Sequence, residues 1–294
     1  MALLTTARIG ELAIELLRRQ VVLPATVSRV AEADYTGTGG TVTLSVPVPR
    51  TAREQETRGA TITFDEIEED SVNVVLRHFY DAVPLTDEAM TLDLVDYGRQ
   101  VLAPQVASVA ARAEDEIASA MSSLEPDPEI EWSAEPDPDA DDDVLLAIRE
   151  RLSDNDVPLG NRTVAVATDV ARRLLGVPKF SQADARGNAG ETALAQATLG
   201  TIYGMQVVES TALPKGTAIG YHRSAFAYGN RAPIVPDGVF GASVSDSGLA
   251  LRVVRAFDTS RLTTASVVSV FAGANVVEDG EDVKRAVRVN VEGS

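Results

Sequence analysis

The sequence predicts an α+β protein in which helices and one hairpin come first and strands alone come last. Apolar residues recur at helical spacing near the amino terminus and again over residues 92–124. Beyond residue 205 they cluster instead in short runs separated by turn residues, which is the pattern of strands. This order favours segregated helices and a mainly antiparallel sheet over alternating βαβ units.

The composition limits the kinds of site that the protein can carry. The chain has 294 residues and 45% of them are apolar, which is enough to bury a core in one large domain or two smaller ones. It contains no cysteine, so disulfides, thiolate metal sites and cysteine nucleophiles are excluded. No run of 18 apolar residues occurs, and the first 20 residues indicate an amphipathic helix rather than a secretory signal. We therefore expect synthesis in the cytoplasm and no membrane partner.

The charge is negative and unevenly placed. A formal net charge of -18 argues against a protein that grips DNA or RNA through phosphates, because such binding needs clustered Lys and Arg. Residues 125–143 (EPDPEIEWSAEPDPDADDD) hold ten acidic residues, four prolines and no basic residue, so they supply more than half of the net charge. This segment is predicted to be a solvated acidic linker.

The first helix is predicted over residues 6–20, and Pro24 ends it. Alternating apolar residues then predict a strand at 41–48, a partner strand ATITF at 60–64 and a third strand at 71–79. The first two would form a hairpin over 41–65.

This hairpin has a polar tip and one apolar face. A two-stranded hairpin is only marginally stable alone in water, so another surface must cover it. It either packs on its own domain or reaches onto a neighbouring subunit. In the second case its charged tip residues are the candidate inter-subunit contacts: Arg50, Arg53, Glu54, Glu56 and Arg58.

Residues 92–124 form the longest helical pattern, with one continuous apolar stripe. At 1.5 Å per residue, such a helix would be roughly 45 Å long. Pro104 lies inside it and is predicted either to bend the helix or to mark its true first turn.

The second half begins with two short helices around a buried strand. Helices are predicted at 144–152 and at 168–176, the latter with Thr168 as its cap and Gly176 as its end, and the strand is predicted at 161–168. A further short helix is predicted at 190–200. The remaining strands are predicted at 205–210, 217–228, 248–257 and 265–277.

Glycines punctuate the stretch TLGTIYGMQVVESTALPKG at 198–216. Gly200 and Gly204 are predicted to permit tight turns between helix and strand. Pro214 and Gly216 are predicted to end the strand that follows.

Each candidate for catalysis or metal binding has a structural alternative that we favour. His78 and His222 both lie in predicted strands, and no GxSxG elbow supports a nucleophile. Asp137, Asp139 and Asp141 match the first three ligand positions of a calcium loop. The sixth position of that loop should be Gly and is Asp142, however, and the twelfth should be Glu and is Ile148. We expect no enzyme activity, no cofactor and no dedicated metal site.

Two long segments of the second half have a distinctive order of elements. Residues 144–175 read VLLAIRERLSDNDVPLGNRTVAVATDVARRLL, and residues 180–216 read FSQADARGNAGETALAQATLGTIYGMQVVESTALPKG. With TAIGYHRSAFAY, with the closing RVVRAFDTSRLTTASVVSVFAGANVV, and with the arm helix, hairpin and spine helix before them, they resemble the major capsid proteins of tailed bacteriophages. The resemblance covers nearly the whole chain and lies in order and spacing more than in any one motif.

This resemblance implies the Hong-Kong-97-type phage capsid fold. The parts would be an N-terminal arm at 1–33, an extended β-hairpin loop at 34–75, a peripheral domain at 76–124 and 250–294 with its spine helix at 92–124, and an axial domain at 125–249.

The same resemblance implies a structural role without catalysis. Subunits of this family self-assemble into hexamers and pentamers of an icosahedral shell, which encloses dsDNA without sequence-specific binding. The protein would then be found in the virion after assembly in the host cytoplasm. Because no scaffold-sized extension precedes the arm, the branch with a separate scaffolding protein is nearest, and scaffolding protein and portal are expected partners. Some relatives crosslink a loop lysine to a neighbour, but residues 34–75 contain no lysine, so that chemistry is not expected here.

Two alternatives remain open at the level of sequence. An encapsulin-like shell of a cellular nanocompartment would share the fold and enclose a cargo enzyme in place of DNA. An unrelated acidic α+β enzyme would instead depend on His78 or His222.

Overall fold

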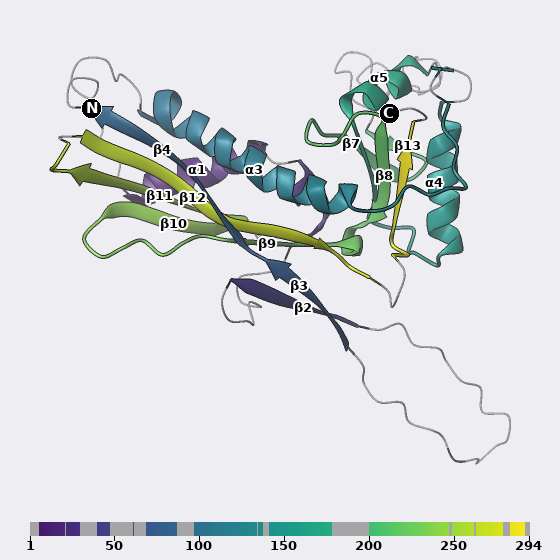
Figure 1. The fold of residues 1–294 in the computed structure, drawn as a ribbon, viewed down its shortest axis with the longest axis horizontal. Coiled ribbons are helices and arrows are strands. Elements are labelled where there is room, and N and C mark those ends of the chain that lie inside the picture. Colours follow the sequence, from purple (N-terminus) through teal and green to yellow (C-terminus); the bar gives the residue numbers. More distant parts are fainter. Residues whose placement is uncertain are drawn as a thin grey trace.

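The computed structural model describes residues 6–20, 22–29, 40–47, 61, 69–86, 97–133, 135–137, 141–177, 200–246, 249–261, 263–278 and 283–291. A long sheet carries helices on one face, and a compact second unit lies at one end of it (Figure 1). A two-stranded hairpin leaves the long sheet on the side opposite the helices (Figure 1). None of the helices among the described residues is long and apolar enough to cross a membrane.

The long sheet has six strands, and β12 (Thr263–Val276) is its centre. The strand order is β1-β9-β12-β11-β10, and β4 pairs with β12 on its other side. Alternate residues of β12 point to the helices and are buried, as a strand with one covered face requires. The remaining strands of this sheet are β1 (Ser28–Arg29), β4 (Arg77–Thr86), β9 (Phe226–Arg231), β10 (Phe240–Asp246) and β11 (Leu249–Asp258).

Helix α3 (Ala103–Ser122) is the predicted spine helix and packs along β12, while α1 (Thr6–Gln20) lies beside α3 on β10 and β11. Pro104 lies in the first turn of α3, which confirms one of the two expectations for it. The chain before it is nonetheless helical, as a π-turn over Gly98–Leu102. A helix continues through this point because the missing N–H of proline is tolerated where the hydrogen-bond pattern changes.

The second unit contains a five-stranded sheet in the order β13-β8-β5-β7-β6. β5 lies at its centre and is buried along its whole length, with a parallel neighbour on one side and an antiparallel one on the other. The strands and the helices of this unit are β5 (Arg162–Val166), β6 (Thr201–Ile202), β7 (Met205–Glu209), β8 (Thr217–His222), β13 (Ala286–Asn290), α4 (Asp143–Asp154) and α5 (Thr168–Gly176).

The predicted cap of α5 is wrong by one residue. Thr168 is already helical, and the cap position is taken by Ala167, whose backbone is extended. Ala167 still donates its N–H to Thr217 O of the neighbouring strand, so the sheet extends up to the first helical residue and leaves no free loop position for a side-chain cap. The short helix predicted at 190–200 lies outside the described residues except for Gly200.

The segment TAIGYHRSAFAY, predicted as one strand, is two strands in different sheets. β8 belongs to the five-stranded sheet, and a single 3-10 turn at Arg223–Ala225 separates it from β9 in the long sheet. Residue 249 therefore does not separate the strands of one sheet from the strands of the other. β9 pairs with β12 and β10 pairs with β11 in the long sheet, whereas β13 returns to the five-stranded sheet and pairs with β8.

The predicted partner of the first hairpin strand is also wrong. β2 (Thr41–Pro47) pairs along its whole length with β3 (Glu69–Val75), and Thr61 of the expected partner ATITF is not in a strand. The strand predicted at 71–79 is divided at Leu76, where β3 ends and β4 begins. β3 is therefore the second hairpin strand and leads directly into the long sheet.

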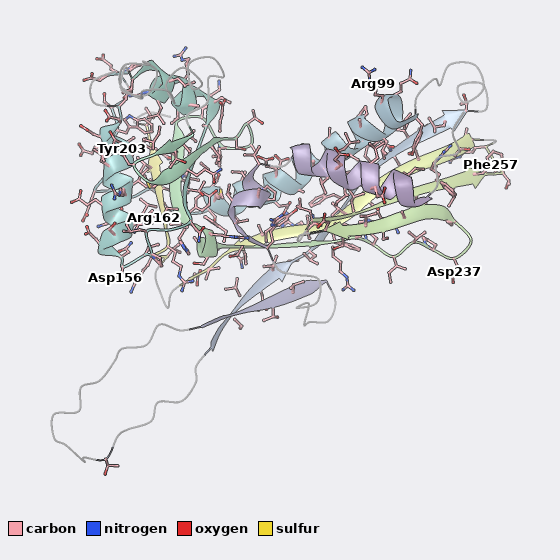
Figure 2. The ribbon with its side chains drawn as sticks, turned by 180° about the vertical axis from the view of Figure 1, so that it is seen from behind. Arg99, Asp156, Arg162, Tyr203, Asp237 and Phe257 are labelled. Carbon is pink, nitrogen blue, oxygen red and sulfur yellow. The ribbon has the colours of Figure 1, made fainter. Side chains whose placement is uncertain are left out.

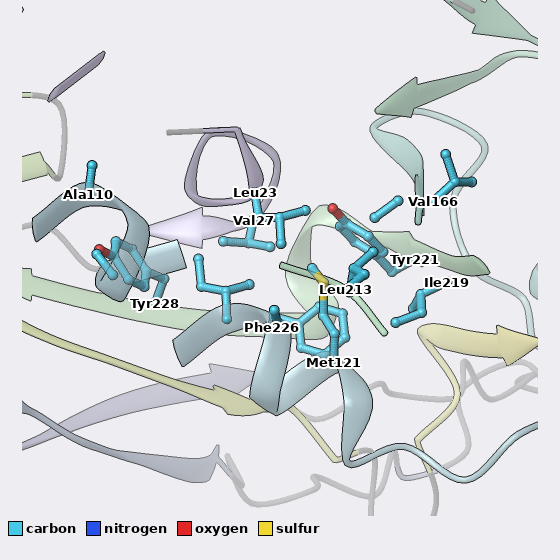
Figure 3. Close-up of a cluster of buried hydrophobic side chains, with 14 of the residues drawn as sticks. Leu23, Val27, Ala110, Met121, Val166, Leu213, Ile219, Tyr221, Phe226 and Tyr228 are labelled. Carbon is cyan, nitrogen blue, oxygen red and sulfur yellow. The ribbon is translucent and has the colours of Figure 1, made fainter. Parts of the chain in front are cut away.

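One core joins the two units where the end of α3 meets β8 and β9 (Figure 3). Tyr221, Phe226 and Met121 are fully buried there, and the Tyr221 and Phe226 rings meet edge to face at 5.3 Å. The short helix α2 (Leu23–Thr26) contributes Leu23 to the same cluster. The connection after α1 is thus part of the junction between the two units.

Candidate functional site

The two histidines have structural surroundings. His222 Nδ1 accepts the Ser224 N–H at 3.2 Å and lies 2.8 Å from Ser224 Oγ, so it caps the 3-10 turn that links β8 to β9. A catalytic triad needs its serine on one ring nitrogen and a carboxylate on the other. Here both contacts of Nδ1 go to a residue two positions on. Burial, followed by the charges of Arg285 and Arg162, lowers the pKa of His222.

His78 lies on the face of β4 that the helices leave uncovered. Its ring is 4.7 Å from that of Phe271 on the paired strand β12 and 6.2 Å from that of Tyr80. Burial, followed by the charge of Arg252, lowers the pKa of His78. This histidine is one member of an aromatic cluster on a sheet, and the described residues give it no hydrogen bond to a carboxylate or a hydroxyl group.

Of the three calcium-loop candidates, Asp141 is occupied by other contacts, and so is Asp142 at the mismatched sixth position. Asp141 is 3% exposed, forms a salt bridge with Arg173 and accepts the Trp132 Nε1–H at 3.1 Å. Asp142 is fully buried and accepts the Tyr203 hydroxyl at 2.6 Å. Among the residues that the structure describes, no group of three or more acidic or histidine side chains is placed to hold a metal ion. Asp139 lies outside the described residues.

The expected solvated linker is therefore partly wrong. Trp132 is 5% exposed, and the Arg173 guanidinium lies 4.9 Å from the centre of its ring. Arg173 also donates to the carbonyl oxygens of Ser133 and Glu135. One guanidinium therefore holds the middle of the segment as well as Asp141 near its end. The acidic composition predicted a solvated segment, but the contacts of Trp132 and Asp141 with Arg173 hold it against α5 of the five-stranded unit.

An open cleft of about 580 Å³ lies between this segment and the start of α4. Carboxylates dominate its lining, with Ile130, Trp132 and Val144 as apolar members, and no basic side chain is among the described lining residues. Such a lining repels phosphate groups, so it does not suit a nucleotide site.

The uncovered face of the long sheet carries exposed apolar side chains. Tyr80 is 68% exposed there, and its neighbours on the same face include Ala82, Val267 and Phe271. The described residues place no helix on this face. Exposed apolar surface of this kind is typical of a protein interaction site.

The root of the hairpin sits at one end of the same face. Val72 and Val74 of β3 pack against Ala227 and Val277, apart from the main core. Asn275 Nδ2 also donates to Asn73 O at 3.0 Å. The candidate contact residues at the hairpin tip, Arg50, Arg53, Glu54, Glu56 and Arg58, lie outside the described residues, so their role stays a prediction.

Two charged residues at the junction of the units were not singled out from the sequence. Glu114 lies in the run ARAEDE of α3, and Arg288 lies in β13. Arg288 Nη1 donates to Ser122 O at 2.6 Å and to Leu124 O at 2.9 Å, so it neutralises the carboxyl end of α3. Nothing in the local sequence distinguishes either residue from an ordinary surface charge.

Comparison with known proteins shows what this arrangement resembles. No protein-family model matches the sequence, and no curated protein matches it. Among solved structures, a chain of Mycobacterium phage Che8 matches with a TM-score of 0.63 and 21% identity over 94% of this chain and 93% of that one. The capsid of cyanophage P-SCSP1u matches with a TM-score of 0.63 and 13% identity over 93% and 89%. A virus-like particle from Pyrococcus furiosus matches with a TM-score of 0.55 and 9% identity over 97% and 99%.

These similarities extend over almost the full length of each chain, so they include the long sheet, the five-stranded unit and the order that connects them. They confirm the α+β capsid fold that the sequence predicted. The chain has the fold of phage capsid proteins.

Proposed function

We propose that the chain is the major capsid protein of a tailed bacteriophage, a structural shell subunit without catalytic activity. The observation that carries the proposal is that one subunit has both a protruding hairpin and an uncovered sheet face. The root of the hairpin packs on the long sheet, and the sheet exposes Tyr80 and its apolar neighbours on the side from which the hairpin leaves. A subunit that is complete only with copies of itself exposes such surfaces before assembly.

In this proposal the parts of the chain have separate tasks. The long sheet with α3 is the peripheral domain, the five-stranded unit is the axial domain, and residues 34–75 are the extended loop. Hexamers and pentamers need heterologous contacts, in which different surfaces of neighbouring copies meet. The hairpin of one copy and the uncovered sheet face of the next provide two such different surfaces.

The expected partners follow from this role. The shell encloses dsDNA without reading its sequence, and the net charge of -18 keeps the subunits from binding the packaged DNA tightly. Scaffolding protein and portal take part in assembly. The protein is made and assembled in the host cytoplasm and ends in the virion.

Electron microscopy of the protein, alone and co-expressed with its scaffolding protein, tests the proposal. Closed icosahedral shells or rings of five and six subunits are the expected result. A protein that stays monomeric under both conditions contradicts it.

Deletion of residues 49–58 tests the hairpin itself. We expect a folded monomer with normal circular dichroism and strongly reduced assembly, because the deletion leaves the root contacts of β3 in place. An unfolded protein would show that the hairpin belongs to its own core.

A cellular compartment shell is the second candidate, because the Pyrococcus furiosus virus-like particle shares the fold over 97% of this chain. The contents of particles made in the native host separate the two candidates. Packaged dsDNA supports the phage capsid, and an enclosed enzyme supports the compartment.

A further inference from the structure

One carboxylate on the spine helix contacts two segments that are far apart in the sequence. Glu114 of α3 accepts the Ser210 hydroxyl on Oε1 at 2.8 Å and the Val22 N–H on Oε2 at 3.3 Å. Ser210 directly follows β7 of the five-stranded unit and is 3% exposed. Val22 directly precedes α2, on the connection that leads from α1. The α1–α2 connection, the spine helix and the five-stranded unit therefore meet at one side chain.

A second polar contact joins the same connection to the same unit. The Tyr221 hydroxyl of β8 is 2.5 Å from Thr26 Oγ1, the last residue of α2. Tyr221 is fully buried, and Figure 3 shows it facing Leu23 and Val27 on either side of Thr26. A buried hydroxyl that loses its partner is costly, so this bond holds α2 close to β8.

The five-stranded unit is also fixed to the spine helix at a point that does not involve α2. Arg288 of β13 donates to the carbonyl oxygens of Ser122 and Leu124 at the end of α3. Glu114 and Ser122 are eight residues apart, which corresponds to about 12 Å along a helix. Besides the shared core, two separated polar contacts thus hold the unit to α3, and of these two only the Glu114 contact includes the α1–α2 connection.

We propose that Glu114 is a coupling residue, which makes the position of the α1–α2 arm and the position of the five-stranded unit depend on each other. Its two oxygens are used at the same time, one for each segment. When the carboxylate is removed, the Val22 N–H and the Ser210 hydroxyl lose their acceptor together, so both segments loosen. Arg288 holds the unit to the helix without transmitting anything to the arm.

The coupling has a use in the shell, and this use rests on the proposed function. The arm and the five-stranded unit lie on different parts of the subunit and would touch different neighbours. A contact made by one would then stabilise the position of the other through Glu114.

Hydrogen exchange followed by mass spectrometry, on the full-length unassembled protein, tests the coupling. Glu114→Gln keeps the shape of the side chain but leaves one acceptor oxygen for two donors, and Glu114→Ala removes both acceptors. We expect exchange to become roughly tenfold faster in residues 22–27 and also in 210–221, as for the loss of a charge-assisted hydrogen bond. Asp115→Asn is the matched control, because within the described part of the chain Asp115 pairs with exposed Arg112 alone, on the same helix, and it should change neither segment.

Two results would overturn the proposal. One is faster exchange at only one of the two segments, or at neither, in Glu114→Gln. The other is the same pattern in Asp115→Asn.

Arg288→Met provides the converse test. It should loosen residues 286–290 and the end of α3 while residues 22–27 keep their exchange rate, and faster exchange in 22–27 would contradict the assignment. These measurements need no assembly, so a failure of the coupling and a failure of the capsid proposal are distinguishable.

Discussion

Single buried cations organise the loops of the five-stranded unit. Arg162 is 3% exposed and donates to the carbonyl oxygens of Pro158, Val157 and Arg149 and to Ser153 Oγ. These acceptors belong to the end of α4 and to the loop that leads into β5. Figure 2 shows Arg162 and Asp156 of this loop at the same end of the unit.

Replacement of this arginine tests its importance. Arg162→Met leaves several buried carbonyl groups without a donor, and we expect a loss of about 3 kcal/mol in the free energy of unfolding, measured with urea. Arg149→Met is the control, because Arg149 is exposed and its change should cost less than about 0.5 kcal/mol. Equal effects of the two substitutions would show that the hydrogen bonds of Arg162 contribute little.

The pKa of His222 predicts how stability depends on pH. Burial lowers the pKa of His222 in the folded protein below its ordinary value of 6.5. As the pH falls through 6.5, the unfolded chain takes up a proton that the folded chain does not. The free energy of unfolding therefore decreases on acidification and levels off below the folded pKa.

A variant that keeps the cap but cannot titrate isolates this effect. His222→Asn retains an acceptor for the Ser224 N–H, since asparagine forms the same local turn. We expect thermal melts between about pH 5 and pH 7.5 to show a smaller decrease in stability than the parent protein. His78, whose pKa is also lowered, contributes to the decrease that remains. An unchanged pH dependence would contradict the assignment to His222.

The glycine turns of residues 198–216 could be predicted from the sequence, but the unusual backbone conformation of Tyr203 between them could not. Gly200, Gly204 and Gly216 all have positive φ angles, as their positions in the sequence indicated. Tyr203 also has a positive φ, 50°, which is unfavourable for a bulky residue. Its hydroxyl donates to Asp142, sixty-one residues earlier, and burial followed by that contact raises the pKa of Tyr203 to about 12. A contact between segments so distant in sequence leaves no local signal.

At the scale of elements, helices were predicted better than strand partners. The stripe over α3 and the buried β5 were evident because each shows its own periodicity. The partner of β2 was not, because the alternating runs at 60–64 and 71–75 fit it equally well. The observed packing selects the second run, since Val72 and Val74 of β3 fill the small core beside β9.

The root of the hairpin depends on a close approach between two backbones. A Cβ atom added to Gly273 of β12 would lie 2.1 Å from Val75 O, at the end of β3. We expect Gly273→Ala to displace the root and to lower the free energy of unfolding by about 1–3 kcal/mol, measured in urea. Gly176→Ala is the control, because nothing lies within 4 Å of a Cβ there and its φ is not positive, so its stability should be unchanged or slightly higher. A neutral Gly273→Ala would show that the hairpin tolerates another angle.

At the scale of the whole molecule, net charge governs association. Copies with a charge of -18 repel one another, and salt screens this repulsion. We expect light scattering to show faster shell growth as NaCl rises from about 0.05 M to about 0.3 M at fixed protein concentration. Sucrose of equal osmolality serves as the control and should not have the same effect. A slower reaction in salt would indicate that attractive ion pairs between subunits dominate.

The overall fold was predictable because the order of helices and strands is shared with phage capsid structures whose residues differ at most positions. The division of the chain between the two units was not, since β9, β10 and β13 follow spatial neighbours and not sequence order. Phe257 of the long sheet and Tyr203 of the five-stranded unit lie at opposite ends of the molecule (Figure 2). Along the chain, however, the long-sheet strands β9 to β12 lie between β8 and β13 of the five-stranded sheet.

The backbone passes between the two sheets three times: after α3, through the 3-10 turn between β8 and β9, and between β12 and β13. A single cut at any one crossing would leave the units covalently joined through the other two. A chain nicked at one of these places would keep its two units together, and a force that pulls on one unit would be shared among three connecting segments. For the proposed shell, the interleaved path is a form of mechanical redundancy.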